Sequence, residues 1–176
     1  IRKQATLQLR EIGSGRAPTS GTLNNISIFI RFSDQTEFGQ TISTYSSMFN
    51  GSSGNTMQSY FLEASYTALN ISTSFYPTPT TYVVSWQDSH PRGYYSPYSS
   101  SNTIGYSNDS QRTDREFTLL VNAVNGVSSQ IPTSLALDGD NDGMVDNVCF
   151  IIKGTTDGWA ELLWPHRWSI YDRYVY

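Results

Sequence analysis

The segment from residue 138 to residue 146 carries the residue types and spacing that specify chemistry most directly. It reads Asp-Gly-Asp-Asn-Asp-Gly-Met-Val-Asp. Aspartates at its positions 1, 3 and 5 with glycine at position 6 match the first half of a calcium-binding EF-hand loop. A tight turn with this spacing directs three carboxylates toward one point, and glycine permits the sharp bend. The predicted ligands are Asp138, Asp140, Asp142, the backbone carbonyl of Met144 and, directly or through water, Asp146.

The segment departs from a complete EF-hand at position 12, where Cys149 stands in place of a bidentate glutamate. An apolar run follows where an EF-hand would have a helix. Four carboxylates within nine residues repel one another strongly without a cation, which favours a metal site over the alternative of a solvated acidic turn. Calcium suits such an oxygen set better than magnesium, which requires a smaller octahedral shell. We therefore predict a calcium site of moderate affinity, completed by water or by a ligand from elsewhere.

The sequence motifs that mark common catalytic sites are missing. The two histidines are His90 and His166, and neither begins an H-E-x-x-H zinc motif. There is no Gly-x-Ser-x-Gly elbow and no glycine-rich phosphate loop. For His166 three roles stay open: a packed histidine bonded to a backbone carbonyl, a residue of a cleft together with Trp168, or a metal ligand. Cys149 lies in an apolar run, which indicates a buried small side chain.

Composition narrows the class of protein. The 176 residues are 38% hydrophobic and 14% aromatic, enough for one domain with its own core. The net charge of −4 and the absence of a basic cluster beyond Arg2 and Lys3 give no reason to expect a nucleic-acid partner. No apolar stretch approaches the roughly 20 residues of a membrane helix. Because millimolar calcium is available outside cells, a modest calcium site favours a secreted or cell-surface location.

Hydrophobic periodicity predicts a series of strands after a polar arm at residues 1–24, which itself includes a candidate strand at 5–10. In residues 25–32 the isoleucines and Phe32 alternate onto one face, and Phe29 on the other face indicates a largely buried strand. The further predicted strands are 70–76, 80–86 and 148–153.

Helical periodicity appears three times. Residues 44–49 predict a short helix, and residues 56–69 a longer one with Asn55 as its N-cap. The clearest helix has a capping-box pattern from Thr113 to Glu116 and Gly126 as the residue after its end. Its predicted apolar stripe is Phe117, Leu120, Val121 and Val124. Residues 87–111 are irregular and rich in tyrosine, which fits a binding loop as well as aromatic residues that cover core edges. Together the elements predict one α/β or α+β domain over residues 25–176, with a mixed sheet and two or three packed helices.

Four short motifs in this order resemble the immune inhibitor A family of secreted bacterial zinc metallopeptidases. They are Ile26-Ser-Ile-Phe-Ile-Arg-Phe-Ser-Asp34, the helix–strand segment from Met57 to Ile71, the acidic loop with its strand at 138–152, and Leu163-Trp-Pro-His-Arg-Trp-Ser169. The resemblance spans about residues 25–170. In that family the zinc motif H-E-x-x-H lies downstream of the Trp-His-Trp segment, beyond Tyr176.

The resemblance implies the N-terminal half of a zincin-like peptidase domain, which supplies the sheet, a cleft wall and a calcium site without the zinc ligands. A peptide or protein would be the substrate, zinc would enter only with the downstream motif, and this chain alone is expected to be inactive. An edge strand, at 25–32 or 80–86, would hold an extended peptide. Two readings from other classes stay open: a non-catalytic calcium-dependent module that binds glycans or proteins, and a structural domain.

Overall fold

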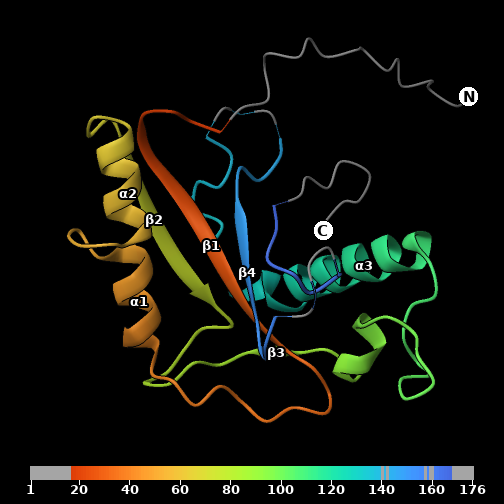
Figure 1. Ribbon diagram of the computed structural model, residues 1–176. Helices are drawn as coiled ribbons and strands as arrows, with labels where there is room; N and C mark the ends of the chain where they lie inside the picture. Colours follow the sequence, from red (N-terminus) through yellow and green to blue (C-terminus); the bar gives the residue numbers. More distant parts are fainter. Residues whose placement is uncertain (1–16, 140, 142, 157, 159–160, 168–176) are drawn as a thin grey trace, which may run out of the picture.

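The computed structural model describes residues 17–139, 141, 143–156, 158 and 161–167. Figure 1 shows a sheet with helices on both faces. The strands are β1 (Gly21–Arg31), β2 (Leu69–Tyr76), β3 (Trp86–Gln87) and β4 (Val148–Ile152). The helices are α1 (Ile42–Asn50), α2 (Met57–Ala64) and α3 (Asp109–Val127), with short 3-10 turns at Arg92–Tyr95 and Ser128–Gln130. The predicted α/β class is therefore confirmed.

Strand β1 lies at the centre of the sheet, and every ladder between the named strands is parallel. Residues Gly21 to Ile28 pair with β2, and Ile26 to Ile30 pair with β4. Because Ile26 to Ile28 take part in both ladders, β2 and β4 lie on opposite sides of β1. The short β3 joins β1 at Ile30 and Arg31. The carboxyl ends of the strands thus share one edge of the sheet.

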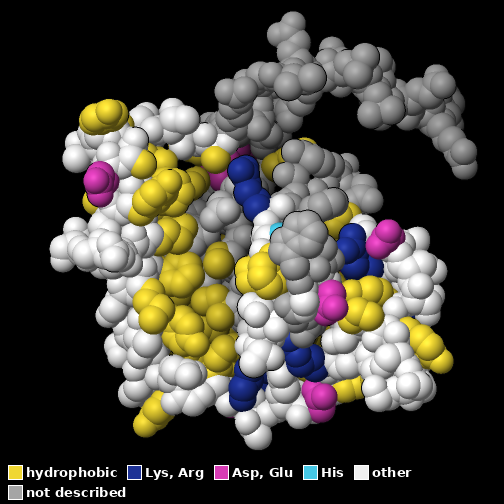
Figure 2. Space-filling view, in the orientation of Figure 1, with side chains coloured by type: hydrophobic (Ala, Val, Ile, Leu, Met, Phe, Trp, Pro, Cys, Tyr) yellow, Lys and Arg dark blue, Asp and Glu magenta, His cyan; other side chains and the backbone are white. Residues whose placement is uncertain are grey.

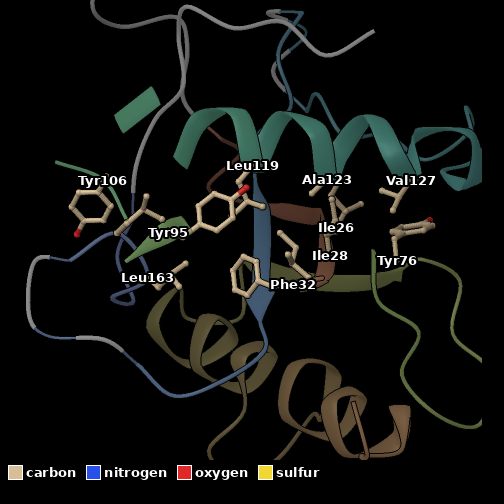
Figure 3. Close-up of a cluster of buried hydrophobic side chains, with 12 residues drawn as sticks. Ile26, Ile28, Phe32, Tyr76, Tyr95, Tyr106, Leu119, Ala123, Val127 and Leu163 are labelled. Carbon is tan, nitrogen blue, oxygen red and sulfur yellow. The ribbon is translucent and has the colours of Figure 1, made fainter. Parts of the chain in front are cut away.

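The alternation predicted for β1 determines the two layers of the core. Its isoleucines and Phe32 pack toward α3, where Leu119, Ala123 and Val127 are fully buried (Figure 3). We call this side the α3 face. Phe29 points to the opposite side and packs with Phe38, Phe75 and Val83. We call that side the α1–α2 face.

The α1–α2 face is only partly covered. Neither α1 nor α2 has a fully buried residue, although their aromatic side chains pack on the sheet. Figure 2 shows hydrophobic side chains gathered in the region beside these two helices. All five residues of β4 are half-buried, in contrast to the nearly continuous burial of β1 from Asn25 to Ile30. The sheet is therefore better covered at its centre than at β4.

The strand prediction for residues 80–86 is wrong, apart from Trp86. Tyr82 forms an isolated antiparallel bridge with Thr41, and the Val83 N–H donates to the Gln40 carbonyl. This segment therefore pairs with the chain that leads into α1 and does not extend the main sheet. Neither of the two segments expected to form a peptide-binding edge strand does so. Strand β1 is interior, and Trp86 is the one residue of 80–86 that belongs to the main sheet. The strand predicted at 25–32 is present but begins earlier, at Gly21.

The predicted helices are present with different ends. Helix α1 matches its prediction closely, whereas α2 ends at Ala64 because Tyr66 and Thr67 adopt positive φ angles of 53° and 66°. Its N-cap is Thr56, whose side chain accepts from the Ser59 N–H, and Asn55 lies outside the helix. The strands predicted at 70–76 and 148–153 correspond to β2 and β4.

Helix α3 differs more from its prediction. It begins four residues before Thr113, with the Asn108 side chain as the cap that accepts from the Gln111 N–H. At the other end the helix continues through Gly126 to Val127, so the prediction that Gly126 follows the helix is wrong. Among the described residues, no helix is long and apolar enough to span a membrane. The candidate strand at 5–10 lies outside the described residues.

Candidate calcium-binding loop

The acidic loop connects the 3-10 turn after α3 to β4, so it enters the sheet directly beside the central strand. Of its predicted ligands, Asp138, Met144 and Asp146 are described, whereas Asp140 and Asp142 lie outside the described residues. The described part of the chain holds no group of three or more histidine, cysteine or acidic side chains arranged for a metal ion.

The backbone of the loop takes a tight turn at the predicted position. Asn141 and Gly143 both have positive φ angles, 58° and 85°. Glycine adopts this region without strain, and asparagine tolerates it better than most residues. The Gly143 N–H donates to Asp138 Oδ2 at 2.7 Å, which closes the turn over the first carboxylate. The expectation that Gly143 permits a sharp bend is met by this conformation.

The two outer carboxylates hold the ends of the loop together. Asp146 Oδ2 accepts from the Gly139 N–H at 2.8 Å, and the Asp146 N–H donates to the Leu137 carbonyl at 2.9 Å. The side chains of Met144 and Val145 are about half exposed, at 48% and 49%, so they point away from the turn. Hence the carboxylates of Asp138 and Asp146 bond the backbone of the loop, whereas the side chains of Met144 and Val145 are exposed.

The residue at EF-hand position 12 cannot complete the ligand set. Cys149 lies within β4, where it pairs in register with Ser27 of β1. Burial raises the pKa of its thiol, an effect that the neighbouring Ser27 hydroxyl only partly opposes. A protonated thiol is a poor calcium ligand, because calcium prefers hard oxygen donors. Of the predicted calcium ligands, the described part of the chain therefore contains Asp138, Asp146 and the Met144 carbonyl.

Side-chain amides attach the loop to the sheet. Asn147, next to Asp146, donates through Nδ2 to Asn25 Oδ1 at 2.5 Å. Asn24 Nδ2 donates to the Ala136 carbonyl at 2.9 Å, just before the loop begins. Both ends of the acidic segment are thus bonded to consecutive residues of β1.

His166 has partners on both ring nitrogens. Nδ1 lies 2.5 Å from the Trp164 carbonyl, and Nε2 lies 2.6 Å from Glu116 Oε1 of α3. Partial burial disfavours the charged ring, but the carbonyl and the Glu116 carboxylate outweigh it and raise the pKa of His166. The bond to the Trp164 carbonyl agrees with the first of its three predicted roles, although the His166 side chain is 34% exposed and not packed in the core. Its neighbour Trp168 lies outside the described residues.

A second histidine cluster at the carboxyl edge of the sheet was not predicted. Asp88, directly after β3 and only 2% exposed, accepts at Oδ2 from the His90 N–H, His90 Nδ1 and the Tyr95 hydroxyl, at 2.8, 3.0 and 2.9 Å. The His90 ring stacks on Tyr94, whose ring is 3.8 Å from the Arg115 guanidinium. Burial and the Asp88 carboxylate together raise the pKa of Tyr95. The sequence signal that could have identified this cluster is an aspartate just after a strand and two residues before a histidine.

This cluster orients His90 without assembling a catalytic triad among the described contacts. Ser89 Oγ lies 3.5 Å from His90 Nδ1, the nitrogen that already faces Asp88. In a catalytic triad the nucleophile would instead lie near Nε2. Asp34 accepts from the Arg92 N–H at 3.0 Å and stabilises the same edge. The cluster thus fixes the loop that follows β3.

Comparisons of the chain with protein-family models, with curated proteins and with solved structures found no match.

Proposed function

We propose that this chain is a calcium-stabilised, sheet-bearing part of a secreted zinc endopeptidase domain, in which the loop at residues 138–146 binds one calcium ion. The observation that carries the calcium proposal is the closed turn, in which the Gly143 N–H bonds Asp138 while Asn141 and Gly143 adopt left-handed backbone angles. A turn of this shape brings alternate carboxylates of the segment toward one centre.

The role of the ion follows from where the loop lies. It precedes β4, which is half-buried throughout and is held to β1 by five register pairs. An ion that neutralises the four clustered aspartates removes their mutual repulsion and fixes the entry into this strand. Calcium would therefore act as a structural clamp on the β1–β4 pair.

The peptidase part of the proposal is supported by the order of the motifs along the chain. It assigns this chain no catalytic residue. The described residues offer no zinc-ligand set, and His166 is bonded at both nitrogens. Zinc would enter only with an H-E-x-x-H motif after Tyr176, and a peptide or protein would be its substrate. The chain by itself is proposed to be inactive.

The alternative of a glycan-binding module receives less support from the tyrosine-rich segment. Tyr95 and Tyr106 are 2% and 9% exposed, and Tyr94 is stacked between His90 and Arg115. These rings cover the core and the His90 cluster, so they do not form an open platform. Tyr98 is the exposed tyrosine of this segment, at 55%.

A calcium titration of chelator-stripped protein tests the first part. For a dissociation constant of about 10⁻⁴ M, typical of extracellular sites, about 10 mM calcium should stabilise the fold by about 2.7 kcal/mol. This corresponds to a rise in Tm of roughly 5–10 °C for a chain of this size. Asp138→Asn keeps an oxygen for the Gly143 N–H but loses the charge, and should remove most of the rise.

The matched control is Glu63→Gln, an exposed position of α2 with the same change in charge. It should leave the calcium-dependent rise intact. An unchanged Tm in stripped wild-type protein across the titration would refute the calcium proposal. For the peptidase part, the residues encoded after Tyr176 decide: an H-E-x-x-H within several tens of residues supports it. Without one, a glycan-array signal abolished by chelator would establish the binding module instead.

A further inference from the structure

A row of amide and hydroxyl side chains crosses the sheet from the acidic loop to the end of α1. Asn147 donates to Asn25 Oδ1, and Asn25 Nδ2 in turn donates to Thr73 Oγ1 at 3.1 Å. The backbone of Thr73 is then bonded twice by Asn50, the last residue of α1. The Thr73 N–H donates to Asn50 Oδ1 at 2.8 Å, and Asn50 Nδ2 donates to the Thr73 carbonyl at 2.9 Å.

The middle of this row is buried. Asn25 is 0% exposed and Thr73 is 6% exposed, on the α1–α2 face where their neighbours in β1 and β2 are largely apolar. A buried amide is stabilised only while its polar atoms have partners, and removing one partner leaves the other group with its full desolvation cost. Within the described part of the chain, Asn25 Oδ1 accepts from the Asn147 amide. The position of Asn147 therefore determines whether the Asn25 carbonyl oxygen is satisfied.

We infer that Asn25 and Asn147 are positioning residues that couple the occupancy of the calcium loop to the pairing of β1 with β2 at Thr73. The inference rests on the calcium proposal, because it needs an ion that fixes Asp146. Asn147 is covalently next to Asp146, so an ion bound by that carboxylate also restricts where the Asn147 amide can lie. The ion and the amide row then favour the same position of the loop.

Such a coupling is reciprocal. If calcium strengthens the amide row, then an intact amide row must strengthen calcium binding by the same factor, and couplings of this kind typically amount to about 5-fold or more. A residue of β2, which lies on the other side of β1 from β4 and contributes no ligand, should therefore influence calcium affinity. A purely local calcium site would not respond to such a change.

The experiment compares two substitutions at Thr73 in the full chain. Thr73→Val keeps the branched shape but removes the oxygen that accepts from Asn25, whereas Thr73→Ser keeps the oxygen. Calcium affinity is measured by competition with a chelating dye. We expect Thr73→Val and Asn147→Ala to weaken calcium binding about 5-fold or more, Thr73→Ser to stay near wild type, and the exposed-site control Ser72→Ala to have no effect.

Hydrogen exchange in the wild-type protein gives a second readout that does not depend on the variants folding. On adding calcium, exchange of the Thr73 amide should slow by a larger factor than exchange of Ala123, which lies in α3 on the other face. Equal slowing of both amides, or a calcium affinity unchanged in Asn147→Ala and Thr73→Val, would overturn the coupling while leaving the calcium site intact. Absence of any calcium binding to the wild type would overturn both proposals.

Discussion

Replacing Gly126 by alanine should destabilise the protein, although alanine is the better helix former. Gly126 lies inside α3, one residue before its end. A Cβ built there would lie 2.3 Å from Trp86 Nε1 and 2.5 Å from Trp86 Cδ1. Trp86 belongs to β3, and its backbone is held in the sheet by its pairing with Ile30. The indole therefore has to move for the new methyl group to fit.

Two opposing effects determine the size of the change. At an unobstructed helix position, glycine to alanine stabilises by about 1 kcal/mol. Carbon atoms in good contact are about 3.5–4.0 Å apart, so the indole must shift by more than about 1 Å, and overpacking of this kind costs about 1–3 kcal/mol. The expected net result is a loss of about 1 kcal/mol, with the sign opposite to that of an unobstructed site.

Urea unfolding of wild type and Gly126→Ala measures this loss, and repeating the substitution in a Trp86→Ala background isolates its cause. Without the indole, Gly126→Ala should stabilise by about 1 kcal/mol. Gly39→Ala lies in a loop where no atom beyond its chain neighbours is within 4 Å of the new methyl, and it controls for the reduced backbone freedom of the unfolded chain. A Gly126→Ala protein that is more stable than wild type would refute the packing of α3 on Trp86.

Two further predictions concern the polar clusters. Tyr95→Phe removes a buried donor to the Asp88 carboxylate and should cost about 1.5–3 kcal/mol, the range for hydrogen bonds to charged groups; a change below about 0.3 kcal/mol in urea unfolding would contradict that bond. The raised pKa of His166 means that the stability from its pair with Glu116 is fully present below about pH 6.5, the ordinary value, and is lost as the pH rises through the folded pKa. The difference in urea midpoint between wild type and His166→Gln should therefore be larger at pH 5.5 than at pH 9, and a difference independent of pH would count against a charged pair.

Local patterns were sufficient to predict most of the elements, because each depends on neighbouring residues. The period of two in β1 predicted which side chains share a face, and the structure places Phe29 opposite the isoleucines as expected. The error at residues 80–86 has a tertiary origin: Tyr82 pairs with Thr41, a residue about forty positions away, and periodicity carries no information on such a partner. The prediction that Gly126 follows the helix failed for a similar reason, since the glycine allows close contact between α3 and Trp86 and does not end the helix.

The candidate site also has features that local sequence patterns predict and features that they do not. The spacing of the aspartates and Gly143 is a local property, and the closed turn agrees with it. The row from Asn147 to Asn50 was missed because its members contact one another only after the strands are paired. The Asp88–His90–Tyr95 cluster is local in sequence, but residues 87–111 are irregular and their pattern did not predict which side chains meet. The neighbours of His166 in sequence gave no indication of its contact with Glu116, which lies fifty residues away in the chain.

By itself, the sequence determined that a short acidic turn precedes an apolar strand in an α/β domain, because turn conformation, strand alternation and helix periodicity are set by residues a few positions apart. Only the tertiary structure decided that β1 is the centre of a parallel sheet and that buried amides bond the acidic loop to it. Strand order and hydrogen bonds between distant side chains depend on which apolar surfaces are buried together, and many pairings of the same elements are compatible with the same local patterns.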